Sequence, residues 1–142
     1  MAKDFKTLVR MRKWALDEKQ RELGEMLGVL GNLEAEKTAL EQAIIAEQKI
    51  AAENPELAGF AYGGFANAVI AEREAITKMI AEQEEKIDTF RDVVADAFKE
   101  LKTAEIAERN RADAERAEED KKEQDELDEI GTRSATRDDG LI

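Results

Sequence analysis

NPELAGFAYGGF, residues 54–65, is the stretch that decides how the chain is organised. It holds the only proline, three of the eight glycines and three of the six phenylalanine and tyrosine residues. Clusters of proline and glycine mark turns, and the sequence on both sides is polar and typical of long helices. We therefore predict that residues 53–65 form the tip of a hairpin.

The composition favours long exposed helices over a chain that encloses a pocket. Of the 142 residues, 39% are charged and 5% are aromatic. The net charge of −12 argues against binding of a nucleic-acid backbone, which requires a basic surface. Because cysteine and histidine are both absent, a zinc–thiolate site and the usual near-neutral general base are excluded.

We expect a cytoplasmic protein with no direct membrane insertion. No run of about 18 apolar residues is present, as a membrane-spanning helix would require. The opening sequence MAKDFKTLVRMRKW is basic but lacks the continuous apolar core of a signal peptide.

The first helix is predicted at about residues 4–52, with Asp4 as its N-cap. Two rows of residues at heptad spacing follow it and predict a seam for one partner helix. Interrupted by charged residues, the rows contain Val9, Leu16, Leu23, Leu30, Ile44 and Ala51, and Phe5, Met26, Leu33 and Leu40.

The second helix is predicted at about residues 66–130. After Ala104 its apolar rows give way to charged residues, so the helix is expected to continue partly solvated to Gly131, before a disordered tail at residues 132–142. Its rows, with Gln83 intruding, are Val69, Ile76, Phe90, Ala97 and Ala104, and Ile80, Ile87, Val94 and Leu101.

Folding the chain at the tip places residue i opposite about residue 118 − i and brings the basic start near acidic residues of the second helix. Opposite charges that face each other favour an antiparallel pair, although both charge blocks could also be merely solvated. The predicted fold is all-α, with two long helices that form an antiparallel coiled-coil hairpin as a single domain at residues 1–131.

Other patterns leave alternatives open. Gly24, Gly28 and Gly31 lie on one face away from the seam, either because another backbone approaches there or the helix bends, or because the flexibility is tolerated. The run Glu82–Glu85 is interpreted as a solvated helix face rather than a metal site. Gly63-Gly64 lacks the flanking residues of a phosphate-binding loop, so we expect no cofactor and no enzymatic activity.

The scarce aromatic residues are candidate contacts. Phe60, Tyr62 and Phe65 either close the tip by packing near Val69 or anchor a partner protein, since interfaces are enriched in aromatic residues. Trp14 lies off the main seam beside the basic block, as a rim residue of the hairpin or a partner contact.

The opening FKTLVRMRKWALDEKQRELGE resembles the start of the FliJ family, the small stalk component of the bacterial flagellar type III export ATPase complex. Phe5, Leu8 and Arg12 match the family's F-x-x-L-x-x-x-R pattern. The late segment AEIAERNRADAERAEEDKKEQDELDEI is similar to the Arg/Glu-rich C-terminal helix of the family. The strongly acidic balance departs from the basic character of many members.

The resemblance implies a non-enzymatic stalk and escort protein, peripherally associated with the membrane-bound export apparatus. Its expected partners are the export ATPase, the export gate and export chaperones. The ATPase would contact the open end, carried over to Phe5, Leu8, Arg10, Arg12, Glu108, Arg111 and Glu115. The gate would contact residues toward the tip: Ile45, Phe60, Tyr62, Phe65 and Val69.

Two other functions remain open at this point. The chain could be the equivalent stalk of a virulence type III secretion system, which has the same fold and acts in the same way. It could also be an unrelated homodimeric coiled-coil scaffold or chaperone, which would form concentration-dependent oligomers and bind no ATPase.

Overall fold

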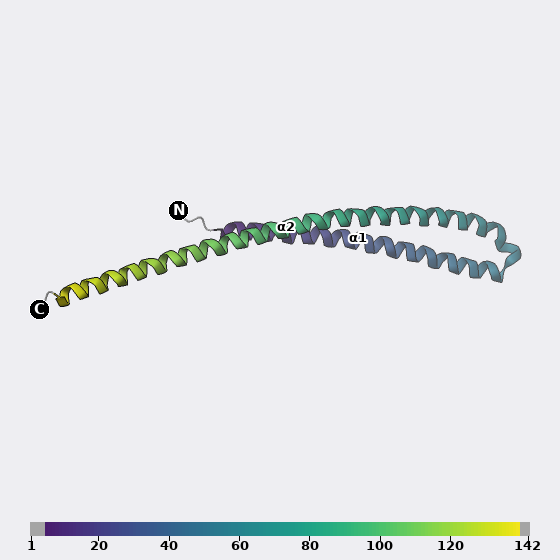
Figure 1. Cartoon of the computed structure of the whole chain (residues 1–142). Coiled ribbons are helices and arrows are strands. Elements are labelled where there is room, and N and C mark those ends of the chain that lie inside the picture. Colours follow the sequence, from purple (N-terminus) through teal and green to yellow (C-terminus); the bar gives the residue numbers. More distant parts are fainter. Residues whose placement is uncertain (1–4, 140–142) are drawn as a thin grey trace. The chain divides into compact units, whose positions relative to one another are not determined.

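The structure, a computed structural model, describes residues 5–139, and the side chains of residues 5–56 and 63–137. This part of the chain forms two α-helices and contains no strand (Figure 1). Helix α1 extends over Lys6–Glu53 and helix α2 over Pro55–Asp139. The predicted all-α class is confirmed.

The helices contribute to two compact units. Unit 1 contains Met1–Ala15 and Phe98–Ile142, and unit 2 contains Leu16–Ala97. In unit 1 the side chain of Arg12 pairs with Glu100, and in unit 2 the amide of Gln83 donates to the carbonyl oxygen of Met26. Residue numbers rise along one helix as they fall along the other, so α1 and α2 are antiparallel, which confirms the predicted helical hairpin.

The predicted heptad rows form the interface between α1 and α2. In unit 2, Ile87 is 3% exposed and Val69 is 6% exposed. In unit 1, Ala104 is 3% exposed and Leu101 is 7% exposed. Because two helices cannot enclose a side chain from every direction, most of the seam is half-buried. These residues are Phe5, Val9, Leu23, Met26, Leu30, Leu33, Leu40, Ile44, Ala51, Ile76, Ile80, Phe90, Val94 and Ala97.

The tip is much shorter than the predicted loop at residues 53–65. Between the two helices only Asn54 lies outside helical structure, and its N–H donates to the carbonyl oxygen of Ile50 at 3.1 Å. Asparagine is favoured as an N-cap, proline fits the first helical position, and Glu56 places negative charge in the first turn. The local sequence therefore starts α2 at Pro55, and no described glycine has a positive φ that would interrupt the helix.

This early reversal also corrects the predicted register. Phe5 bonds to Glu108 and Arg12 to Glu100, so residue i of α1 lies opposite about residue 112 − i in unit 1, rather than 118 − i. The prediction assumed that the chain turned midway through residues 54–65. Since it turns at Asn54, each residue of α1 meets an earlier residue of α2.

The predicted disordered tail is helical as far as Asp139, and residues 140–142 lie outside the described residues. Gly131 does not end α2. Contacts within the helix support its last turns: Arg133 pairs with Glu129 at 2.8 Å, and the hydroxyl of Thr136 donates to the carbonyl oxygen of Thr132. An isolated glycine costs only about 1 kcal/mol relative to alanine in a helix, so these helix-compatible flanks override it.

Candidate functional site

The residues expected to meet the ATPase all lie in unit 1, and the structure brings four of them together. The backbone N–H of Phe5 donates to Oε2 of Glu108 at 2.9 Å. Arg111 donates to both oxygens of Glu108, at 3.0 and 2.7 Å. The third guanidinium nitrogen of Arg111 pairs with Glu115 at 2.9 Å. We call Phe5, Glu108, Arg111 and Glu115 the capping cluster.

The capping cluster joins the start of α1 to α2. Helix α1 has no acidic residue in its first turn, although the first N–H groups of a helix lack acceptors and carry partial positive charge. Glu108 supplies an acceptor and negative charge from the other helix, while Asp4, the predicted N-cap, lies outside the described residues. Glu108 is held for this role by Arg111, and both side chains are 17% exposed.

Glu108 and Arg111 shift each other's pKa. The hydrogen bond from Arg111 lowers the pKa of the Glu108 carboxyl group, and the N–H of Phe5 lowers this pKa further. In turn, the bond to Glu108 raises the pKa of Arg111. Glu108 and Arg111 are therefore both charged at neutral pH, and their geometry is that of a structural clamp.

The remaining expected ATPase contacts divide into two groups. Leu8 is half-buried, and Arg12 forms an ion pair with Glu100 at 2.9 Å, so both face α2. Arg10 is exposed and points away from the seam. Of this set, Arg10 is therefore the residue of α1 best placed to meet another molecule.

Two exposed residues of α1 lie beside Arg10. Met11 was not predicted as a contact, and Trp14 was predicted to be either a rim residue or a partner contact. Met11 is 62% exposed and Trp14 is 67% exposed. Together with Thr7, Arg10 and Ala15 they line a shallow groove of about 480 Å³. Their i, i+3 spacing off the heptad rows is the signal that identifies them as one surface. We call Met11 and Trp14, with the flanking Arg10 and Lys13, the aromatic patch.

The residues expected to meet the export gate lie in unit 2 and have different surroundings. Ile45 is 65% exposed, Phe65 is half-buried and Val69 is 6% exposed, so Val69 belongs to the interface between the helices. The side chains of Phe60 and Tyr62 lie outside the described residues. Of the described members of this set, Ile45 alone presents a large apolar side chain to solvent.

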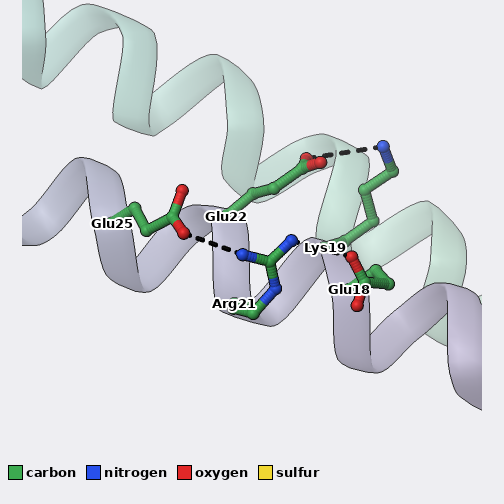
Figure 2. A network of polar contacts seen from close by, with 5 residues as sticks. All are labelled: Glu18, Lys19, Arg21, Glu22 and Glu25. Carbon is green, nitrogen blue, oxygen red and sulfur yellow. Dashed lines mark hydrogen bonds and ion pairs between the residues drawn. The ribbon is translucent and has the colours of Figure 1, made fainter.

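Charged residues form ion pairs along α1 in unit 2, and Lys19 among them reaches the Phe90 ring of α2 at 5.9 Å. Figure 2 shows Arg21 between Glu18 and Glu25, with distances of 2.9 and 2.8 Å, and Lys19 beside Glu22 at 3.5 Å. The hydrogen bond from Arg21 lowers the pKa of Glu18. Such exposed pairs at i, i+3 and i, i+4 support an extended helix but add little stability individually.

The glycines of α1 are open to solvent. No atom lies within 4 Å of a Cβ added at Gly24, Gly28 or Gly31, so no other part of the described chain approaches them. The described residues contain no cluster that could hold a metal ion and no helix that could cross a membrane.

Comparison with known proteins gives one match. The family model of the flagellar FliJ protein matches residues 1–140. Searches of curated proteins and of solved structures found no significant similarity. Because the family match covers nearly the whole chain, and the two antiparallel helices agree with the fold expected from the resemblance, the chain belongs to the FliJ family of flagellar proteins.

Proposed function

We propose that this chain is a non-enzymatic stalk of the flagellar type III export apparatus that binds the export ATPase through unit 1. Its family supports a role in flagellar export. One observation carries the finer assignment: every described side chain of α2 from Asp113 to Arg137 is exposed, yet the segment is helical. A helix that projects without a partner in its own chain is suited to enter a larger assembly.

The capping cluster and the aromatic patch would have separate roles in this complex. The cluster fastens the start of α1 to α2, so a force on one helix is transmitted to the other. Arg10, Met11 and Trp14 offer the exposed aromatic and cationic groups that are enriched at protein interfaces. Coupling to the ATPase would be mechanical or allosteric, and the chain would promote assembly or turnover of the ATPase without chemistry of its own.

The other partners would use unit 2. Ile45 is the candidate contact for the export gate, and this contact would hold the protein at the periphery of the membrane-bound apparatus. Export chaperones are the third proposed partner, which the chain would escort after release of their cargo.

The direct test is ATP hydrolysis by the purified cognate export ATPase with and without this chain. We expect the full chain to increase the turnover and to bind the ATPase in a pull-down. A chain that ends after Ala112 keeps the Phe5–Glu108–Arg111 contacts but lacks the projecting helix, and we expect it to lose most of the stimulation. The proposal is wrong if the full chain neither binds the ATPase nor changes its turnover.

The matched control is Gly28→Ala, which alters an exposed position of unit 2 and leaves unit 1 unchanged. This variant should stimulate the ATPase as the natural chain does. Loss of stimulation in Gly28→Ala would place the contact on the glycine face instead of unit 1.

A further inference from the structure

Unit 1 contains a second exposed apolar surface besides the aromatic patch. On α2, Leu127 is 63% exposed and Ile130 is 59% exposed. They have the same i, i+3 spacing as Met11 and Trp14, so each set forms a compact spot on one side of its helix. We call Leu127 and Ile130 the apolar pair and residues 113–139 of α2 the extension.

The two surfaces carry opposite charge. Residues 113–129 contain ten acidic and three basic residues. The aromatic patch is flanked by the cations Arg10 and Lys13, which form no hydrogen bond or ion pair with another described residue. On the extension, Glu126 is likewise exposed and without such a partner. The two surfaces therefore match, because each has an apolar spot of the same spacing and their charges are opposite.

One register satisfies both features. If α1 of one copy lies parallel to the extension of another, Met11 meets Leu127 and Trp14 meets Ile130. The same alignment places Arg10 level with Glu126 and Lys13 level with Glu129. Glu129 already pairs with Arg133 at 2.8 Å, but this pair is exposed and can be exchanged at little cost.

The same alignment is also compatible with two-fold symmetry. In one chain Arg12 pairs with Glu100, so Met11 lies level with about residue 101 of α2. When Met11 docks onto Leu127, residue 101 of one α2 lies level with residue 127 of the other α2, and the two α2 helices are antiparallel. A two-fold axis produces the reciprocal contact at the same time, so both patches and both apolar pairs are covered.

We propose that the free chain forms a two-fold symmetric dimer in which each extension docks on the aromatic patch of the other copy. The dimer would cover the surface of unit 1 that is proposed to meet the ATPase, so self-association and ATPase binding would exclude each other. This mutual exclusion rests on the proposed function, whereas the dimer of the free chain does not. Because each contact contains only four large apolar side chains, we expect a dissociation constant of roughly 10–100 µM.

Sedimentation equilibrium of the full chain tests the dimer. At about 0.05 M NaCl we expect a monomer–dimer equilibrium, and at about 0.5 M NaCl about tenfold weaker association, because salt screens exposed charges. Replacement of both Met11 and Trp14 by serine should abolish the dimer and leave the helical circular dichroism unchanged, since both side chains are exposed. A chain that stays monomeric up to about 1 mM at low salt would overturn the proposal.

Disulfide trapping tests the register. The chain has no cysteine, so single cysteines can be introduced cleanly. A mixture of the Met11→Cys and Leu127→Cys variants should form a mixed disulfide dimer on mild oxidation. The control mixture of Met11→Cys with Thr132→Cys should give at least about fivefold less, because Thr132 lies on the opposite face of the extension at 3.6 residues per turn.

Each outcome of the trapping experiment either supports or overturns the proposed dimer. Preferential formation of the 11–127 disulfide supports the docking of extension on patch. Equal trapping of both mixtures, or a dimer that persists after serine replacement of Met11 and Trp14, would show that the copies associate through another surface. Binding of the patch to an acidic helix of a different protein, with no self-association, would likewise overturn the dimer.

Discussion

At the start of α1 the backbone N–H of Phe5 donates to a residue of the other helix. Glu108 reaches Phe5 from α2 at 2.9 Å and is itself held by Arg111. A cap supplied by the same helix would stabilise α1 whether or not the helices were paired. A cap supplied by α2 acts only in the hairpin, so the start of α1 depends on correct register.

The first prediction concerns this cap. Glu108→Gln keeps an oxygen near Phe5 but removes the charge that complements the helix terminus and binds Arg111. We expect amide hydrogen exchange in the first turn of α1 to become about threefold faster at neutral pH. Glu115→Gln is the matched control, because Glu115 contacts Arg111 but not α1, and it should change this exchange much less.

The same residue predicts a pH dependence. The pKa of Glu108 is lowered in the folded chain, so its stabilising effect is present above the unfolded pKa. This contribution is lost as the pH falls through the lowered, folded-state pKa. Thermal unfolding of the natural chain should therefore become easier on acidification. Part of the change should be missing in Glu108→Gln, and identical pH profiles for both proteins would contradict the assignment.

Gly28 provides a prediction of opposite sign. An added Cβ meets no atom within 4 Å, and no described glycine has a positive φ. Gly28→Ala should stabilise the chain by about 1 kcal/mol and raise the unfolding midpoint by about 3 °C in circular dichroism. If this variant also weakens binding of a partner, the exposed glycines are a site of close approach, and if binding is unchanged they are tolerated flexibility.

At the scale of the helices, stability depends on a narrow seam. Ile87 is 3% exposed and Ile70 is 50% exposed, although both are isoleucines of α2 in unit 2. Ile87→Ala should destabilise the chain by about 2–4 kcal/mol, and Ile70→Ala should change the free energy of unfolding by less than about 1 kcal/mol. Equal losses in urea unfolding would show that the face with Ile70 is also buried.

The seam could be predicted from sequence because heptad spacing is a property of each helix alone. The residues that interrupt it were located equally well: Gln83 is half-buried and donates to the carbonyl oxygen of Met26 at 3.0 Å. The tip was wrong because Pro55 was interpreted as a turn residue, while its position after Asn54 makes it a helix start. Because the turn was placed too late in the sequence, the predicted register between α1 and α2 was also wrong.

The candidate sites depend on this register and were therefore harder to predict from the sequence. The sequence selected Phe5, Glu108 and Arg111 through family resemblance, without indicating that they bind one another. Hydrogen bonds that join residues 103 positions apart follow only from the correct alignment of the helices. Met11 was missed because a single methionine off the seam is not informative by itself, and only its i, i+3 spacing to Trp14 marks the two residues as one surface.

At the scale of the whole chain, we expect the extension to be dispensable for folding. Its described side chains are all exposed, and residues 113–137 make only local contacts in the described part of the chain. A chain that ends after Ala112 should therefore unfold within about 3 °C of the full chain. A much larger fall in the midpoint, measured at a concentration where both are monomeric, would reveal an intramolecular role for the extension.

The reversal at Asn54 limits how this protein can change in length during evolution. With almost no loop between α1 and α2, an insertion in one helix of unit 2 moves every later residue against the other. A seven-residue insertion preserves the seam only when the opposite helix gains seven residues at the same level. Relatives of different length should therefore differ by matched heptads on the two sides of the turn, and unmatched insertions should accumulate in the extension, where no helix of the same chain lies opposite.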